Sequence, residues 1–312
     1  MQNACPRKQD RPHPGVHLFM REHSIIERDA MTELQPYYTT ADAIGEFNAV
    51  TARALTFFGR PVFLYDVLMG WWERRSNNDL IAMIDPADPP RAVLEMGVGT
   101  GNLLGQFVHR FPDARVVGVD LSTNMLRAAH SSLVAGRLDK ANVARFDRLP
   151  PLNDAPDRWP ARVTLARADA LNLPLDDGTF DGIVSSFLLD LLSPAETRRA
   201  VGEMARLLRP GARAWIATLN NRVDPARSLP DYFVKRYFRR ANWWYGQFYR
   251  SPVARTLSKW LFRGYYTHSR PIDLAHYVAQ CDTLTIRRHT DSFIRIAGVP
   301  FVPVRIVELV RS

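Results

Sequence analysis

Glycine occupies every second position in a short run that follows an acidic residue. Glu95 lies at the end of an apolar stretch that predicts a buried strand, and Gly97, Gly99 and Gly101 follow it. Glycine lets the backbone approach a bound ligand at places where any Cβ would collide with it. Residues 103–111 then carry apolar side chains at helical spacing. A strand, a glycine turn and a helix in this order predict a pocket for a nucleoside-type ligand.

The glycine spacing argues against two common nucleotide sites. A dinucleotide fingerprint, G-x-G-x-x-G, would need a glycine at the position of Asn102. A phosphate-binding P-loop ends in Gly-Lys-Ser or Gly-Lys-Thr, and that ending is absent from this run. The acid before the glycines also suits a positively charged ligand better than a pyrophosphate. A glycine-rich turn in an unrelated α/β protein is the alternative at this point.

Further acids follow apolar runs that predict strands. Asp120 ends one such run, and Asp169 is followed by Ala-Leu-Asn-Leu-Pro. Phe180 and Asp181 precede a third run, and residues 207–211 read Leu-Leu-Arg-Pro-Gly. A lone aspartate is more often a helix cap or a surface acid. Acids at three successive strand ends after a glycine loop are instead typical of one binding site.

In this order, the segments resemble motifs of the class I S-adenosylmethionine-dependent methyltransferase family. The glycine loop resembles (V/L)-(L/V)-(D/E)-x-G-x-G-x-G, and residues 168–175 resemble the D-A-x-x-L-P segment. Residues 177–186 resemble the F-D turn with the fourth strand. Residues 207–216 resemble the L-(R/K)-P-G-G corner, with Ala212 in place of the second glycine. The resemblance covers about residues 93–220.

The resemblance implies an α/β fold with a doubly wound, seven-stranded and mostly parallel sheet of the Rossmann-like methyltransferase type. It also implies S-adenosyl-L-methionine as cofactor and no metal. Glu95 and the loop would hold the methionine part, Asp120 the ribose, and Asp169 with Ala170 the adenine. The backbone after the fourth strand would hold the amino group of the cofactor. The expected cofactor-binding residues are Glu95, Gly97, Gly99, Gly101, Asp120, Leu121, Asp169, Ala170, Ser186 and Phe187.

The end of the fourth strand limits the substrate class. Nucleobase amino-methyltransferases carry (N/D/S)-P-P-(Y/F) there, whereas residues 185–192 read Ser-Ser-Phe-Leu-Leu-Asp-Leu-Leu. This run resembles the S-x-x-L-x-x-L stretch of the quinone-methylase-like, methyltransferase type 11 branch, which acts on small and often apolar molecules. Asp190 stands where that branch commonly has histidine. It is either an acid that orients or deprotonates a substrate or a structural acid.

A basic and aromatic segment carries almost all of the net charge of +9. Residues 231–270 hold nine Lys or Arg against one acid, Asp231, together with thirteen of the 33 aromatic residues. Four interpretations remain open: a lid over an apolar substrate, a membrane-surface element, a nucleic-acid site, or a solvated helical face. Nucleic acid is the least favoured of the specific partners. Tyr265, Tyr266 and His268 are catalytic candidates within this segment.

Methyl transfer from a sulfonium is an in-line displacement with an activated leaving group. The protein must align the reactants and exclude water, and it needs a general base only for a nucleophile that keeps its proton. The catalytic residue therefore stays unassigned, with Asp190, Tyr265, Tyr266 and His268 as candidates. We expect methyl transfer to an apolar small molecule such as a quinone, a phenolic or a lipid head group. The alternative is a non-catalytic cofactor-binding or membrane-docking protein.

The chain is long enough for one large domain with extensions. Only Cys5 and Cys281 are present, which favours a reducing, cytoplasmic location, with peripheral membrane contact left open. The longest apolar stretch, residues 61–72, is too short to cross a bilayer and contains Asp66. The expected segments are a disordered lead-in at 1–30, an N-terminal helical cap at 31–90, and the cofactor-binding domain at 91–312 with a lid insertion at 223–270.

Local signals predict several further elements. Residues 41–58 and 61–72 have helical periodicity. Ser193, followed by Pro194 and Glu196, is typical of a helix start with a capping box. The Pro-rich residues 138–160 are expected to form a surface excursion. Two β-rich runs, at 283–288 and 302–310, are expected to form the antiparallel pair that closes the sheet.

Overall fold

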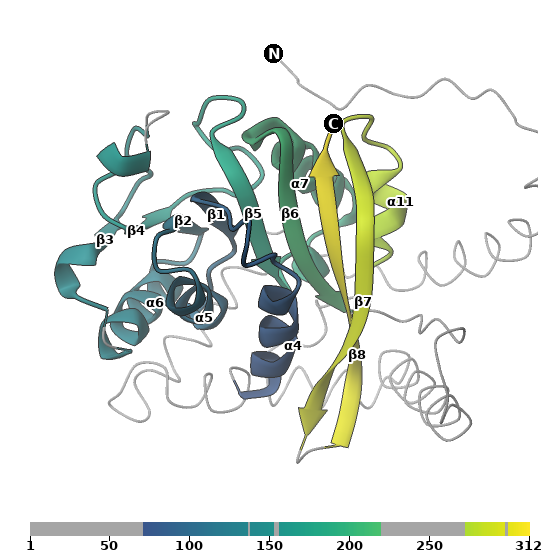
Figure 1. Ribbon diagram of the computed structural model, residues 1–312, viewed down its shortest axis with the longest axis horizontal. Coiled ribbons are helices and arrows are strands. Elements are labelled where there is room, and N and C mark those ends of the chain that lie inside the picture. The colour runs from purple at the N-terminus through teal and green to yellow at the C-terminus, as the bar shows by residue number, and fades with distance from the viewer. Residues whose placement is uncertain (1–70, 137, 153–155, 220–271, 297–298) are drawn as a thin grey trace, which may run out of the picture.

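The computed structural model describes residues 71–136, 138–152, 156–219, 272–296 and 299–312 (Figure 1). Its described strands form one sheet in the order β3-β4-β2-β1-β5-β6-β8-β7. The strands are β1 (Ala92–Met96), β2 (Arg115–Asp120), β3 (Val143–Phe146), β4 (Val163–Arg167), β5 (Phe180–Ser186), β6 (Leu208–Leu219), β7 (Leu284–Ile296) and β8 (Val299–Arg311). The α-helices are α4 (Trp71–Ala82), α5 (Asn102–Arg110), α6 (Thr123–Ala135), α7 (Pro194–Leu207) and α11 (Leu274–Val278). Short 3₁₀ turns are η2 (Lys140–Asn142), η3 (Pro156–Arg158) and η4 (Leu189–Leu191).

The sheet confirms the predicted α/β, doubly wound and mostly parallel architecture. Strands β3, β4, β2, β1, β5 and β6 run parallel, and β8 runs antiparallel to both β6 and β7. The sheet has one strand more than the seven expected, because β3 pairs with β4 at the edge. This strand lies in the segment expected to be only a surface excursion. With four residues and one buried side chain, Val143, it leaves little periodic signal in the sequence.

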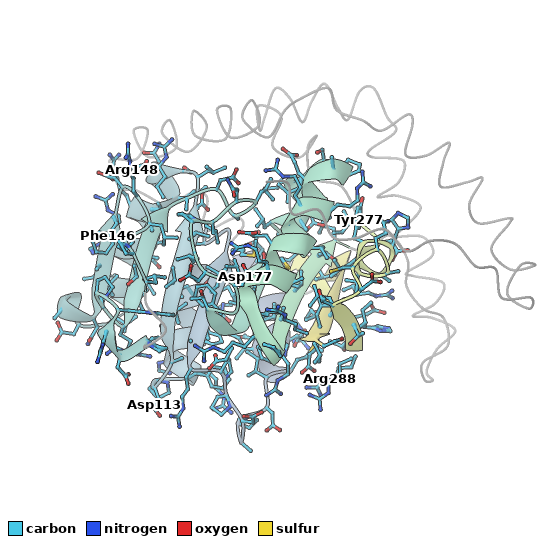
Figure 2. The ribbon with its side chains drawn as sticks, turned by 90° about the horizontal axis from the view of Figure 1, so that it is seen from above. Asp113, Phe146, Arg148, Asp177, Tyr277 and Arg288 are labelled. Atoms are coloured by element: carbon cyan, nitrogen blue, oxygen red, sulfur yellow. The ribbon has the colours of Figure 1, made fainter. Side chains whose placement is uncertain are left out.

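Helices cover both faces of the sheet (Figure 1). Helices α7 and α11 pack on one face with Leu94 and Met96 of β1, while α4, α5 and α6 pack on the other with Val93. Alternate residues of a strand face opposite sides, so both faces of β1 are buried. In Figure 2, Phe146 of β3 and Tyr277 of α11 lie on opposite sides of the molecule. The central strands β1 and β5 therefore lie inside the core.

Three local predictions are confirmed. Helix α5 buries Leu103, Leu104, Phe107 and Val108, as the apolar spacing indicated. Helix α7 begins after Ser193, whose hydroxyl accepts from the Glu196 amide while the Glu196 carboxylate accepts from the Ser193 amide. The antiparallel pair also forms, as β7 and β8. The first two of these signals depend on residues close together in the sequence.

The β7–β8 hairpin is longer than expected and extends beyond β6. The pairing of β8 with β6 ends at Leu219 and Val304, whereas pairing of β8 with β7 continues to Ile296 and Val299. The sequence indicated only residues 283–288 for the first strand, because the polar run His289-Thr290-Asp291-Ser292 interrupts its apolar character. The extra length projects past the carboxyl end of β6, the side on which the parallel strands end.

Helix α4 joins the segment before the sheet to the core. It contacts α5, β6, β7 and β8, and it buries Leu80 and Ile81. Of the predicted helix 61–72, only Trp71 and Trp72 fall within the described residues, as the first turn of α4. The predicted helix 41–58, the segment boundary near residue 30 and the lid insertion lie outside them. Within the described ranges, no helix combines the length and apolar character needed to cross a bilayer.

Candidate functional site

Predicted site residues meet at one edge of the sheet. Glu95 lies near the end of β1, Asp120 ends β2, Asp169 follows β4 by two residues, and Ser186 ends β5. These strands are parallel and adjacent, so their carboxyl ends share one edge. The chain order reverses across β1, with β2 on one side and β5 on the other. Open α/β sheets bind ligands at this kind of switch point.

The glycine loop crosses the end of β2. The amides of Gly97 and Val98 both donate to the carbonyl oxygen of Val119, at 2.9 and 3.0 Å. Gly99 and Gly101 have φ angles of 55° and 82°, in the left-handed region that favours glycine. A Cβ on Gly101 would lie 3.0 Å from Ala129 of α6, whereas a Cβ on Gly99 would meet nothing within 4 Å. The loop is therefore closed against α6 at one glycine and faces open space at the other.

Asp120 is held in place by the backbone around it. Its Oδ2 accepts from the Gly99 amide at 2.9 Å, and its Oδ1 accepts from the Ser122 amide at 2.8 Å. Burial raises the pKa of Asp120, and these two hydrogen bonds act against that rise. A carboxylate has about four acceptor positions. The half-buried group can therefore still accept two hydroxyl donors.

Glu95 is a buried acid with spare hydrogen-bonding capacity. Its side chain is 2% exposed, and its Oε2 has no hydrogen-bond partner among the described residues. Burial raises the pKa of Glu95 well above its usual value, and the nearby charge of Asp120 raises it further. A buried carboxylate without a partner is costly, and a cationic ligand relieves that cost. This position favours a ligand that brings positive charge.

The backbone after β5 turns sharply beside the glycine loop. Ser185 donates from its hydroxyl to the Met96 carbonyl at 2.8 Å, which ties β5 to β1. Phe187 follows with φ 58°, a left-handed conformation that non-glycine residues rarely adopt. A Cβ on Gly97 would lie 3.0 Å from the Cβ of Leu188, so the turn packs directly over the loop. Such strained positions cluster at ligand sites.

Helix α4 reaches the same edge through a residue that the sequence reasoning missed. The Ser186 hydroxyl donates to Oδ1 of Asn77 at 2.7 Å, and the Asn77 side chain is 1% exposed. Asn77 precedes Leu80 and Ile81 by three and four residues, so it lies on the buried face of the helix. The sequence signal was weak, because Glu73 and Ser76 share this side of the helix with Leu80 and Ile81. Asn77 lies outside the motif region, so no motif drew attention to it.

The segment after β4 is fixed by helix α7. Asp169 is exposed, and its Oδ1 accepts from the Leu171 amide at 2.9 Å, while Ala170 is buried. Glu203 accepts from the Leu173 amide at 2.8 Å, and Arg206 donates to the Leu173 carbonyl at 3.0 Å. We call Glu203 and Arg206 the α7 clamp.

The two residues of the clamp also bind each other and the following turn. Arg206 Nε donates to Glu203 Oε2 at 2.9 Å, and the Arg206 guanidinium donates to Asp177 Oδ1 at 2.8 Å. Figure 2 shows Asp177 beside α7. These acidic partners raise the pKa of Arg206, so it stays charged at any pH of interest. No local sequence signal marks the clamp, because its contacts join residues about thirty positions apart.

Of the four catalytic candidates, Asp190 lies within the described residues, and its side chain accepts a hydrogen bond from the backbone. Asp190 is fully buried in η4, and its Oδ1 accepts from the Leu219 amide at 3.0 Å. This contact holds the end of β6 and agrees with the interpretation of a structural acid. Tyr265, Tyr266 and His268 lie outside the described residues.

The F-D turn and Leu121 are explained by their contacts. Oδ1 of Asp181 accepts from the amides of Arg91 and Ala92, at 2.9 and 2.8 Å, and so joins the start of β5 to the start of β1. The Leu121 carbonyl accepts from Arg167 Nε at 3.2 Å and links the ends of β2 and β4. Asp181 lies at the opposite edge from the site, so its role is to align the strands.

The sequence is similar to known proteins over its central part. Residues 94–216 match the model of a methyltransferase domain family. A trans-aconitate 2-methyltransferase of Rhodopseudomonas palustris strain BisB18 is 44% identical over 78 residues, which are 25% of this chain and 29% of that protein. A demethylmenaquinone methyltransferase of Thermus thermophilus is 32% identical over 124 residues, 40% of this chain and 45% of that protein. The chain thus spans less than half the length of either relative.

The fold is also similar to the crystal structure of the [4+2]-cyclase SpnF. The TM-score is 0.55 at 16% identity, over 88% of this chain and 98% of that chain. At this identity the likeness concerns the fold alone. Residues 94–216, with their Rossmann-like sheet, therefore form a class I S-adenosylmethionine-dependent methyltransferase domain.

Proposed function

We propose that this protein is an S-adenosylmethionine-dependent methyltransferase that acts on an apolar small molecule, such as a quinone, a phenolic or a lipid head group. The observation that carries the proposal is the buried Glu95 carboxylate beside the glycine loop, with Oε2 unpartnered among the described residues. A ligand with a sulfonium and an ammonium group supplies the positive charge that this position favours. A dinucleotide or a triphosphate would bring negative charge instead.

The geometry supports an assignment of each part of the cofactor. Glu95 and the loop 97–101 would hold the methionine part, where Gly99 leaves open space. Asp120, with the adjoining backbone of Leu121, would accept the two ribose hydroxyls. Asp169 and Ala170 would hold the adenine. The backbone at Ser186 and Phe187 would complete the methionine end from the β5 side.

The bound cofactor supplies an activated methyl group on a sulfonium. The residues of the chain then have to orient the acceptor in line with that methyl and keep water out. Leu188, packed over Gly97, gives the loop an apolar boundary on the β5 side. Asp190 holds the end of β6 through the Leu219 amide, so we assign it a structural rather than a proton-transfer role.

The substrate class is supported by the sequence rather than by the site geometry. Residues 185–192 lack the Pro-Pro of nucleobase methyltransferases, and residues 231–270 concentrate aromatic and basic side chains. The two relatives differ in substrate class, since demethylmenaquinone is a quinone-type molecule and trans-aconitate is a polar acid. The run at 185–192 favours the quinone-type direction.

A second candidate is a protein that binds the cofactor without methyl transfer. The fold is similar to that of SpnF, a [4+2]-cyclase, and a fold that supports a different reaction favours this second candidate.

One assay separates the two candidates. The protein is incubated with methyl-labelled cofactor and with quinone, phenolic and lipid extracts, and S-adenosylhomocysteine and labelled product are quantified. Methyl transfer predicts stoichiometric S-adenosylhomocysteine and label in one extract. Cofactor binding without S-adenosylhomocysteine in any extract would favour the second candidate.

We also propose that the segment 231–270 contacts an anionic membrane surface. Its nine cations and interleaved aromatics suit an interface, where aromatic rings lie at the head groups. Sedimentation with anionic vesicles tests this, using charge reversal at Arg236, Arg239 and Arg240. Unchanged sedimentation of the reversed variant would contradict it.

A further inference from the structure

We propose that Asn77 of α4 binds the α-carboxylate of the cofactor's methionine part. Helix α4 lies before the residues that match the methyltransferase domain, so no motif assigns Asn77 a role. The inference rests on the proposed function and names a further residue of the same site. It follows from the hydrogen bonds of Asn77, its place on the sheet and the chemistry of the neighbouring acid.

The side-chain amide of Asn77 has donors to spare in a buried place. The Ser186 hydroxyl occupies Oδ1 at 2.7 Å, which leaves the two N–H donors of Nδ2. Among the described residues, none accepts a hydrogen bond from Nδ2. The residue is 1% exposed, so little water reaches this amide. The amide group therefore favours a ligand that brings an acceptor.

Asn77 and Glu95 belong to the same face of the sheet. Val93 and Val184 pack with Leu80 of α4 in one core cluster. Glu95 lies two residues after Val93, and Ser186 lies two residues after Val184, so both face the side of α4. Glu95 pairs in register with Val184, which places Ser186 about 7 Å further along the neighbouring strand. The contact between Ser186 and Asn77 thus lies just beyond Glu95, toward the carboxyl edge.

The two groups are complementary to the two charges of an amino acid. The Glu95 carboxylate suits the α-ammonium, and the neutral amide of Asn77 suits the α-carboxylate as a hydrogen-bond donor. An arginine or lysine at position 77 would instead pair with Glu95 and neutralise it. A neutral donor leaves the acid available for the ligand.

The test compares ligands with and without the amino acid part. We measure calorimetric dissociation constants for S-adenosylhomocysteine and 5′-methylthioadenosine with the unaltered protein and with Asn77→Asp. The Asp variant keeps an acceptor for Ser186, removes both donors and places a negative charge beside the carboxylate. We expect the dissociation constant of S-adenosylhomocysteine to rise by about tenfold or more. This is the effect of losing one hydrogen bond to a charged group. The dissociation constant of 5′-methylthioadenosine should change by less than about twofold, because this ligand has no carboxylate for Asn77 to bind.

Asn78→Asp is the matched control, because Asn78 is the exposed neighbour on the same helix. It should bind both ligands as the unaltered protein does. Asn77→Ala, together with the decarboxylated analogue of S-adenosylhomocysteine, covers the case in which the Asp variant does not fold. That analogue should bind the Ala variant and the unaltered protein equally.

Two results would overturn the assignment while leaving the proposed function standing. One is equal weakening of both ligands by Asn77→Asp, and the other is no weakening of either. Binding of neither ligand by the unaltered protein would overturn the proposed function, and the assignment with it.

Discussion

Two buried glutamates, one in each half of the sheet, differ in whether cationic side chains lie beside the carboxylate. Glu308 on β8 is 0% exposed, and Arg213, Arg287 and Arg288 surround its carboxylate. Glu95 on β1 is 2% exposed and has no cation beside it among the described residues. Burial and residue type are the same in both places, whereas the pairing is not.

The difference separates a structural acid from a binding acid. The arginines around Glu308 join β6, β7 and β8, and Arg288 also donates to the Met83 carbonyl at the end of α4. All these partners belong to the protein, so nothing remains for a ligand. Glu95 has its charge and Oε2 available at a strand end. The acid without a partner marks the site.

The largest expected effect comes from breaking the pairing of Glu308. Glu308→Gln leaves three arginines around a neutral amide, and loss of one partner of a buried ion pair costs about 3 kcal/mol of unfolding free energy. Urea unfolding without ligand measures the loss. The dissociation constant for S-adenosylhomocysteine should stay the same in the folded fraction. A change in affinity without a change in stability would contradict the division between the two glutamates.

Glu95→Gln should give the opposite pattern. Removing an uncompensated buried charge leaves the unfolding free energy equal or higher, because burial opposes the charged form. The affinity for S-adenosylhomocysteine should fall about tenfold, since the ammonium loses its counter-charge. Calorimetry and urea unfolding on the same variant test both parts. Equal loss of stability in the Glu95 and Glu308 variants would remove the contrast.

The pH dependence should follow Glu95 with a defined sign. Its pKa is raised by burial and by Asp120, so the folded state holds a proton that the unfolded state has released. The native state then binds more protons, and stability falls as pH rises from the usual glutamate pKa through the raised one. Over the same interval the affinity for S-adenosylhomocysteine rises, because a cationic ligand favours the carboxylate.

This pH effect is smaller than that of Glu95→Gln, since the acid is only partly protonated within the interval. The affinity trend should be absent in Glu95→Gln, and the stability trend should be weaker, because burial also raises the pKa of Asp120. A pH-dependent affinity that persists in this variant would assign the titration to another group.

The smallest expected effect concerns the α7 clamp. Arg206→Met removes the contact that fixes the segment after Asp169. The ratio of affinities for S-adenosylhomocysteine and S-inosylhomocysteine should therefore fall by about threefold, which corresponds to the loss of one neutral hydrogen bond. The matched control is Arg199→Met, an exposed arginine on the same helix. Competition binding measures the preference. An unchanged preference in the Arg206 variant would mean that the clamp has only a structural role.

Sequence reasoning succeeded where a residue's role depends on close neighbours. Glu95 and Asp120 were predicted to share a site, and the parallel pairing of β1 and β2 brings them to one edge. The capping box at Ser193 is equally local. Asn77 was missed because its partner is 109 positions away, and no pattern connects the two.

Elements with weak periodicity were missed for a related reason. β3 has four residues and one buried side chain, so its pairing with β4 decides its conformation. The second half of β7 contains polar residues that pair with β8 well beyond the predicted run. In both cases hydrogen bonds to the neighbouring strand determine the conformation, and the local sequence pattern does not predict them.

The glycines of the loop differ in how well the surrounding structure would accommodate a side chain. Gly101 cannot gain a methyl group unless α6 moves, because Ala129 lies 3.0 Å from the position of the new Cβ. Within the described protein atoms, only the φ angle of 55° restricts the residue type at Gly99, and asparagine tolerates that conformation. A lineage could therefore exchange Gly99 for asparagine without repacking the core. The middle glycine is the position at which ligand preference can drift while the fold is retained.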